Sequence, residues 1–191
     1  MRITHARATT PFASLSPLVA ADDEGLRQCA DNPAIWTHWV KDMSPQVWAR
    51  EFEWMLAQQD AGRWLFHTVR DSQGEIIGQT CYLAIRPEHH GVEIGGTWYS
   101  PHVHGSKINP ACKLMMLSHA FDCGAQRVEL KTNVNNTRSR AAILKLGATF
   151  EGIHRHHMRQ HDGSWRDTAW YSLLAHEWPA AKAKLEARLA P

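Results

Sequence analysis

The sequence predicts a mixed α/β protein built on one central sheet, with a single domain covering residues 1–191. Strand-like and helix-like segments follow one another in the order β-α-α-α-β-β-β-α-β-α-β-β-α, which is typical of a mixed sheet flanked by helices. Two polar, glycine-containing tetrapeptides, 71–74 and 161–164, separate pairs of long strand-like runs and have the composition of hairpin turns. No internal repeat or Gly/Ser-rich linker divides the chain, whose length is ordinary for one domain.

The first third of the chain is expected to contain one strand and three helices. The strand covers Phe12–Leu15, and the first two helices cover Ala21–Ala30 and Ala34–Trp39. The pair Ser44-Pro45 predicts the start of the third helix, because serine is a good N-cap and proline lacks only an N–H that the first turn does not use. Gly62 is expected to end this helix.

The middle of the chain is expected to form an antiparallel meander of three strands. These strands cover Arg63–Arg70, Glu75–Arg86 and Val92–Tyr99. The adjacent glycines Gly95 and Gly96 in the third strand predict a bulge or a close backbone approach.

The rest of the chain is expected to alternate helices with strands. A polar loop, Ser100–Asn109, leads into a helix over Pro110–Asp122 that Gly124 ends. A strand over Arg127–Val134 and a helix over Thr137–Leu146 follow. The last elements are two strands and a helix, which cover Thr149–Arg159, Trp165–Leu174 and Pro179–Leu189.

Composition and charge exclude several classes of protein. The chain has 21 basic and 19 acidic residues and a net charge of +2, so it lacks the broad basic surface of a nucleic-acid-binding protein. No apolar run approaches the roughly 18 residues of a membrane span, and residues 1–7 lead into no apolar stretch of a secretory signal. The four cysteines have no CxxC spacing and are expected to be reduced thiols. We therefore expect a cytoplasmic protein that binds neither nucleic acid nor membranes.

The loop before the helix at Pro110 is the first candidate for a functional site. It contains small and polar residues and one lysine, Lys107, and it ends in an expected N-cap, Asn109, followed by proline. Unpaired N–H groups and the positive end of the helix dipole at such a helix start favour a phosphate or pyrophosphate. The composition of the loop is equally consistent with a plain connection between a strand and a helix.

Two motifs, in order along the chain, resemble those of the GNAT superfamily of acetyl-CoA-dependent N-acetyltransferases. Residues 101–109 are similar to its motif A, in which Q/R-x-x-G-x-G/A binds the pyrophosphate of CoA. Residues 136–148 are similar to the N-x-x-S…K-x-G-F/A signature of the Rim-type branch, the ribosomal-protein N-terminal acetyltransferase-like group. The resemblance implies a GNAT fold, with a central mixed, mostly antiparallel sheet of about seven strands flanked by helices. It also implies acetyl-CoA as the co-substrate and a primary amine as the acceptor.

The resemblance further implies a set of CoA-binding residues. These are Trp98, His104, Gly105, Ser106, Lys107, Ile108, Asn109, Asn136 and Ser139. Two positions depart from motif A, because His102 replaces its Gln or Arg and Lys107 replaces its final Gly or Ala. We expect the ammonium group of Lys107 to contact a phosphate rather than to block the loop.

Acetyl transfer to an amine requires one group that accepts the proton of the amine and another that protonates the departing thiolate. The resemblance assigns the first role to Glu93, acting through water; the alternative is a solvent-facing glutamate paired with a neighbour. Many family members carry a tyrosine as the acid where this chain has Ile143, and Ser139 matches a Rim-type serine near that role. The alternatives for Ser139 are helix capping and phosphate binding.

The acceptor is expected to be a protein N-terminus or a small amine. Because no cysteine matches a nucleophile position, we expect the amine to attack acetyl-CoA directly in a ternary complex. A homodimer is one of the states that the resemblance allows. One alternative function is a non-catalytic CoA-binding or sensor protein on the same fold. A second is metal binding by the pairs His102/His104 and His154/His156, but no Cys or acidic ligands accompany these pairs, so we expect no metal.

Overall fold

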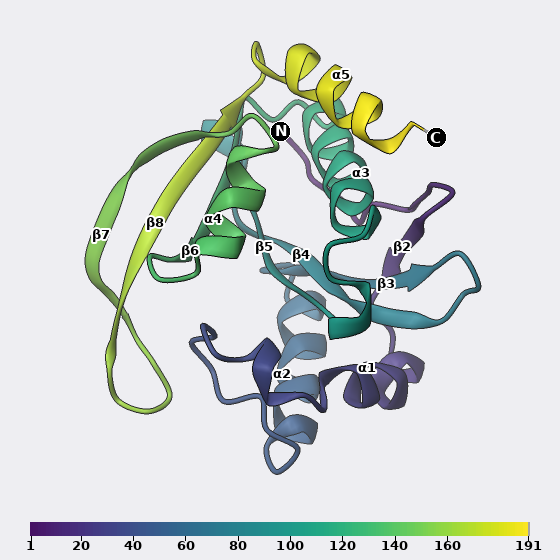
Figure 1. The fold of residues 1–191 in the computed structure, drawn as a ribbon, viewed down its shortest axis with the longest axis vertical. Helices are drawn as coiled ribbons and strands as arrows, with labels where there is room; N and C mark the ends of the chain where they lie inside the picture. The colour runs from purple at the N-terminus through teal and green to yellow at the C-terminus, as the bar shows by residue number, and fades with distance from the viewer. Residues whose placement is uncertain (191) are drawn as a thin grey trace.

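A single sheet of eight strands organises the protein, as seen in a computed structural model that describes residues 1–190 (Figure 1). The strands are β1 (Ala8–Thr9), β2 (Ala13–Pro17), β3 (Leu65–Asp71), β4 (Ile76–Arg86), β5 (Gly91–Tyr99), β6 (Arg127–Asn133), β7 (Thr149–Arg159) and β8 (Trp165–Leu174). Their order across the sheet is β1-β2-β3-β4-β5-β6-β8-β7, and all neighbours are antiparallel except β5 and β6. The predicted mixed, mostly antiparallel sheet is confirmed. The expectation of about seven strands omitted β1, which is only two residues long.

Five α-helices cover the two faces of this sheet (Figure 1). They are α1 (Asp23–Ala30), α2 (Trp48–Asp60), α3 (Ile108–Asp122), α4 (Thr137–Leu144) and α5 (Trp178–Leu189). The helices belong to two apolar clusters. The buried residues of α1 and α2 lie in one, and those of α3, α4 and α5 lie in the other. Neighbouring strand residues alternate between the clusters, as Cys81 and Tyr82 do on β4. The core is therefore two layers of side chains, one on each face of the sheet.

Both predicted hairpin turns are present. Asp71 Oδ1 accepts hydrogen bonds from the backbone N–H groups of Gln73 and Glu75, at 2.9 and 3.0 Å, and Asp162 Oδ1 accepts one from Ser164 N at 2.9 Å. Such side-chain bonds to the backbone two residues ahead explain why an aspartate begins a turn of this kind.

The structure corrects one predicted helix and the starts of two others. The helix expected at Ser44-Pro45 begins at Trp48, because Ser44 first closes a turn in which its carbonyl accepts the N–H of Val47 at 3.1 Å. Only a three-residue 3-10 helix, Pro33–Ile35, replaces the helix expected over 34–39. The helix expected at Pro110 begins at Ile108, so Asn109 is not its N-cap. Proline is tolerated inside the first turn because those N–H groups have no acceptor within the helix.

The neighbouring strands β5 and β6 separate along their length. Their parallel pairing covers only Gly91–Glu93 and Arg127–Glu129, after which β5 stays paired with β4 and β6 with β8. Beyond this point, Thr80 of β4 faces both Gly96 and Thr97 of β5, because Cys81 pairs with Gly95 while Gln79 pairs with Trp98. This is the bulge that the two glycines predicted. Its first residue, Gly96, has a φ of +54°, a conformation that favours glycine.

No helix within residues 1–190 is long and apolar enough to cross a membrane.

We expect the stability of the fold to decrease at acidic pH partly because of His67, which is fully buried on β3 and whose Nε2 accepts the backbone N–H of Ala6 at 2.8 Å. Burial, followed by the nearby His5 and His119, lowers the pKa of His67 from 6.5 to about 3. The unfolded chain therefore binds a proton that the folded chain does not bind as the pH falls from 6.5 towards 3. The free energy of unfolding should fall over this range, with a contribution from this residue of at most about 1.4 kcal/mol per pH unit.

Urea unfolding of the wild type and of His67→Gln between pH 4.5 and 7.5 measures that contribution. Glutamine keeps an acceptor for Ala6 but does not titrate, so its curve should be the flatter one. Parallel curves for the two proteins would contradict the assignment.

Candidate active site

A cavity of about 790 Å³ lies where β5 and β6 separate. Its wall includes β5 from Glu93 to Tyr99, the loop from Val103 to Ser106 and the start of α4. Met55 of α2 and Ile143 of α4, which belong to the apolar clusters on opposite faces of the sheet, both line it. Side chains from both layers of the core therefore line the cavity.

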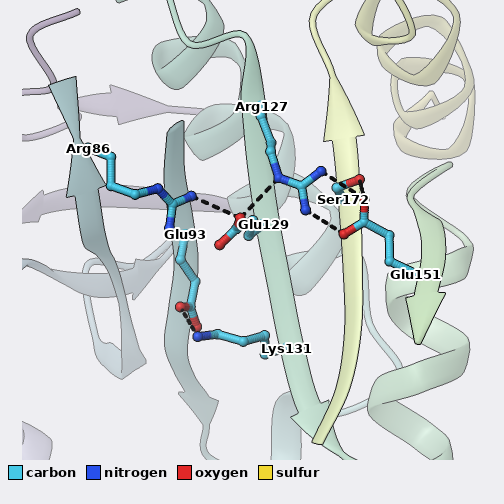
Figure 2. Close-up of polar contacts among 7 residues, drawn as sticks. All are labelled: Arg86, Glu93, Arg127, Glu129, Lys131, Glu151 and Ser172. Atoms are coloured by element: carbon cyan, nitrogen blue, oxygen red, sulfur yellow. Dashed lines mark hydrogen bonds and ion pairs between the residues drawn. The ribbon is translucent and has the colours of Figure 1, made fainter. Parts of the chain in front are cut away.

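Glu93 lies in this wall as a buried carboxylate. Glu93 is 5% exposed, and Lys131 Nζ of β6 lies 2.5 Å from its Oε2 as an ion pair (Figure 2). Burial, with a smaller contribution from Glu129, raises the pKa of Glu93, and the ammonium group of Lys131 acts in the opposite direction. Glu93 is thus not the solvent-facing glutamate of the alternative interpretation, although it is paired with a neighbour. Lys131 was missed in the sequence, because only the sheet register places it beside Glu93.

An ionic network crosses the paired end of β5 and β6 (Figure 2). Glu129 Oε1 on β6 forms an ion pair with Arg86 Nη2 of β4 at 2.8 Å and accepts a hydrogen bond from Arg127 Nε at 3.0 Å. Arg127 also forms a two-pronged contact with Glu151 of β7, and Ser172 Oγ of β8 donates to Glu151 Oε1 at 2.8 Å. The network links β4, β6, β7 and β8 where the two central strands are still together. It therefore stabilises the point from which they separate.

The loop before α3 is joined to α4 through His104. One ring nitrogen, Nε2, is 3.1 Å from the carbonyl oxygen of Tyr99, and the other, Nδ1, is 3.0 Å from Arg138 Nη1. A guanidinium group only donates, so Nδ1 accepts and Nε2 carries the hydrogen. Burial, and then the adjacent Arg138, lowers the pKa of His104. A neutral His104 therefore holds the loop against α4.

Three backbone N–H groups at this loop have no hydrogen-bond acceptor within residues 1–190. They belong to Gly105, Lys107 and Asn109, at the N-terminus of α3. Gly105 has a φ of +79°, and a Cβ added to it would meet no atom within 4 Å. Unpaired N–H groups and the positive end of a helix dipole together favour an anion.

The side chain of Lys107 points elsewhere. Its Nζ donates to the carbonyl oxygen of Ala190 at 2.7 Å and approaches that of Leu189 at 3.4 Å, at the C-terminal end of α5. Neither Lys107 nor the buried Ile108 lines the cavity. The structure brings the other predicted residues into its wall, namely Glu93, Trp98, His104, Gly105, Ser106, Asn109, Asn136 and Ser139.

Cations that the sequence interpretation missed line the cavity instead. Among them are Arg138, Lys145 and Arg188, and Arg188 Nη1 donates to the carbonyl oxygen of Lys145 at 3.1 Å. Arg138 could have been found, because it lies between Asn136 and Ser139 in the second motif. Arg188 could not, because it comes from the last helix in the chain.

The start of α4 shows which residue caps the helix, a role that the sequence left open for Ser139. Asn136 is the N-cap, with its Oδ1 accepting the backbone N–H of Ser139 at 3.0 Å. The hydroxyl group of Ser139 has no hydrogen-bond partner within the described residues, and the residue lines the cavity. Helix capping is therefore performed by Asn136, and the Ser139 hydroxyl remains available to a ligand.

Two further polar groups in the cavity wall are buried without partners. The indole of Trp98, a residue that is 4% exposed, packs edge to face against Trp36 and Trp48, and its Nε1 has no acceptor within residues 1–190. The paired residue on β4, Gln79, has an unpartnered Oε1. Buried donors and acceptors are normally satisfied, so these two atoms are exceptions in residues that line the cavity.

The two histidine pairs considered as metal ligands have other contacts. His102 Nδ1 lies 2.8 Å from Ser100 Oγ, and His104 contacts Tyr99 and Arg138 as described above. His154 stacks on Trp170 at 4.3 Å between ring centroids, and His156 stacks on Trp165 at 5.6 Å. Residues 1–190 contain no group of three or more His, Cys, Asp or Glu side chains placed to hold a metal ion.

Comparison with known proteins gives one family match and several similar structures. Residues 14–149, more than half of the chain, match the family described as the acetyltransferase (GNAT) domain. A crystal structure of a proposed acetyltransferase is 30% identical, with a TM-score of 0.90 over 100% of this chain and 97% of that one. A GCN5-related N-acetyltransferase from Brucella melitensis is 29% identical, with a TM-score of 0.86 over 98% and 90% of the two chains. Mycobacterium smegmatis RimJ, solved in complex with CoA-disulfide, shares the fold at 23% identity, with a TM-score of 0.78 over 92% and 88%. No curated protein matches the sequence.

We expect Lys131→Met to raise the pKa of Glu93. The substitution removes the positive charge that opposes burial and Glu129, so the neutral acid becomes more favourable. A carbon-13 NMR titration of the glutamate carboxyl groups measures the change. Lys182→Met, at a surface position paired with Glu186, is the control and should leave the pKa unchanged. An unchanged or lowered pKa in Lys131→Met would contradict this electrostatic account.

Proposed function

The chain belongs to the GNAT family of acetyltransferases, and on that premise we propose that it transfers the acetyl group of acetyl-CoA to a primary amine. The observation that carries the proposal is the cavity between the separating strands. It brings Glu93 on β5 together with the loop before α3 and the start of α4, which carry the two motifs. An amine beside Glu93 and a CoA molecule along the loop would therefore meet within one cavity.

The proposed path of CoA follows the unpaired donors. The pyrophosphate would accept the N–H groups of Gly105, Lys107 and Asn109, while the guanidinium group of Arg138 supplies a cation beside them. The complex of RimJ with CoA-disulfide supports CoA binding on this fold. We propose no phosphate contact for the ammonium group of Lys107, since it donates to the carbonyl oxygen of Ala190 at the end of α5.

Glu93 is the proposed general base. An α-amine with a pKa near 8 is partly neutral at physiological pH, and the raised pKa of Glu93 makes its carboxylate a stronger base than an exposed glutamate. The neutral nitrogen attacks the thioester carbon, the C–N bond forms while Glu93 takes the proton that the nitrogen loses, and the C–S bond breaks with its electron pair moving to sulfur. Backbone N–H groups near the bulge at Gly95 and Gly96 would stabilise the oxygen that becomes negative. The free hydroxyl of Ser139 is a proposed hydrogen-bond donor to the CoA sulfur.

The cysteines support direct attack by the amine rather than an acyl-enzyme. Burial raises the pKa of the Cys81 thiol far above its usual range and that of Cys112 to about 11. Both residues are fully buried and thus remain neutral thiols at physiological pH. A neutral buried thiol is a poor nucleophile.

The acceptor side of the cavity favours an amine with an apolar body. Trp39, Trp54 and Trp64 line it together with Met43 and Met55. A protein N-terminus with an apolar side chain or a small apolar amine would bury its body against these residues. Its nitrogen would then reach Glu93.

We expect Arg138→Ala to weaken acetyl-CoA binding by about 10-fold, which corresponds to one lost charge-assisted hydrogen bond at an exposed position. Isothermal titration measures the affinity. Lys107→Ala should have a much smaller effect, because that ammonium group binds a carbonyl group at the end of α5. Lys182→Ala is the surface control. Wild-type affinity in Arg138→Ala, or an equal loss in Lys107→Ala, would contradict the proposed path.

We expect Glu93→Gln to lower kcat by roughly 10²–10⁴-fold, the usual contribution of a general base, while acetyl-CoA affinity is retained. A panel of protein N-terminal peptides and small apolar amines supplies the acceptors, and Glu75→Gln, at an exposed position, is the matched control. Equal kcat values for the two variants would exclude Glu93 as the base. Acetyl-CoA binding by the wild type with no turnover on any amine would instead favour a non-catalytic CoA-binding protein.

A further inference from the structure

Lys113 on α3 is a buried cation without a counter-charge. The residue is 6% exposed, and no carboxylate within residues 1–190 lies at ion-pair distance from its Nζ. Its hydrogen bond is donated to Thr97 Oγ1 at 2.8 Å. A charge removed from water is costly unless an opposite charge compensates it. Lys113 is thus placed to meet an anion that the protein itself does not supply.

The ammonium group is held beside the bulge of β5. Its acceptor, Thr97 Oγ1, lies 2.8 Å from Thr80 Oγ1 and 3.3 Å from the carbonyl oxygen of Gly95. Thr97 and Gly95 also line the cavity, as does Lys113 itself. Nζ therefore lies at the part of β5 where the thioester of acetyl-CoA is proposed to sit.

The groups around Lys113 are neutral. The titratable neighbours that act on it are the thiols of Cys112 and Cys81, and burial raises the pKa of both. Glu93, on the same strand as Thr97, is already paired with Lys131. Burial lowers the pKa of Lys113 to about 8, so the ammonium form still predominates at neutral pH but loses its proton readily.

The proposed reaction has no strong proton donor at the leaving sulfur. Ile143, which lines the cavity on α4, has no proton to give, and the Ser139 hydroxyl is a far weaker acid than an ammonium group. A thiolate that leaves in a buried cavity must be neutralised there, since water is scarce and the charge is poorly solvated.

Resting on the proposed acetyl transfer, we propose that Lys113 is the general acid that protonates the departing CoA thiolate. As the amine nitrogen bonds to the carbonyl carbon, the electron pair of the C–S bond moves to sulfur, which takes a proton from Lys113 Nζ. Glu93 takes the proton that the amine loses. Lys113 is then neutral and Glu93 protonated, and one proton taken up by Nζ and one released by the carboxyl group restore the starting state.

The thiol of bound CoA provides a test that needs no acceptor. Burial raises the thiol pKa of bound CoA and a nearby ammonium group lowers it, so this pKa should lie about one to three units lower in the wild type than in Lys113→Met. Ultraviolet absorbance of the thiolate, taken as the difference from the desulfo-CoA complex, measures it across pH. The surface control Lys182→Met should give the wild-type thiol pKa. Equal thiol pKa values in the wild type and in Lys113→Met would overturn the proposal.

Turnover gives a second readout. Lys113→Met should lower kcat for acetyl-CoA by roughly 10²–10⁴-fold. The proposal also predicts that wild-type kcat falls at alkaline pH, as Lys113 loses its proton, and that this fall is absent in Lys113→Met. Acetyl-CoA affinity and the thermal unfolding midpoint should change little, because methionine is of similar length and suits a buried position. If Lys113→Met does not fold, Thr97→Val is the second variant. It removes the acceptor that holds Nζ in place and should raise the thiol pKa of bound CoA above the wild-type value.

The two proposals fail in different ways. A bound CoA thiol with the same pKa in the wild type and in Lys113→Met, in a protein that acetylates amines, overturns the role of Lys113 alone. Absence of CoA binding by the wild type overturns both the proposed function and this inference.

Discussion

Parallel pairing between β5 and β6 is limited to three residues on each strand, and the arrangement of the site depends on this limit. If the pairing continued, the cavity would be closed by strand-to-strand hydrogen bonds. If it were absent, Glu93 on β5 and Lys131 on β6 would not be held together. The network around Glu129 stabilises the paired end, since Arg86 and Arg127 bind the same carboxylate oxygen from β4 and β6. The sheet is therefore fixed at one end and open at the other.

The buried charged residues near this opening are ion-paired, with one exception. Glu93 is paired with Lys131, and Glu129 is paired with two arginines. Such pairing compensates the cost of removing each charge from water. Lys113 alone among these buried groups has a neutral partner, the hydroxyl group of Thr97. A site that must stabilise a transient anion needs an uncompensated cation of this kind, because a paired cation would already be neutralised.

Local patterns in the sequence predicted local structure well. The strands over 149–159 and 165–174 have the predicted bounds, and the predicted bulge is present with Gly96 and Thr97 opposite Thr80, because alternation, turn residues and glycine act over a few positions. The Asn109-Pro110 pair misplaced a helix start by two residues, since Ile108 already has its N–H bound by Ser106 Oγ and joins the helix. Side-chain destinations were harder to predict. Lys107 binds carbonyl groups of residues 189 and 190, more than 80 positions away, and no local pattern signals such a contact. Lys113 was missed for the same reason, because it lies on α3 and its acceptor, Thr97, lies on β5.

Hydrogen exchange with and without acetyl-CoA tests most directly whether the separated strands and the adjoining loop hold this co-substrate. The account predicts slower exchange at the backbone N–H groups of β5 from Gly95 to Trp98 and of the loop from Gly105 to Asn109. Exchange in β1 and β2, at the far edge of the sheet, should stay the same. Saturating acetyl-CoA that protects neither segment, or that protects only the far edge, would contradict the central claim that the opening between β5 and β6 is the site of acetyl transfer.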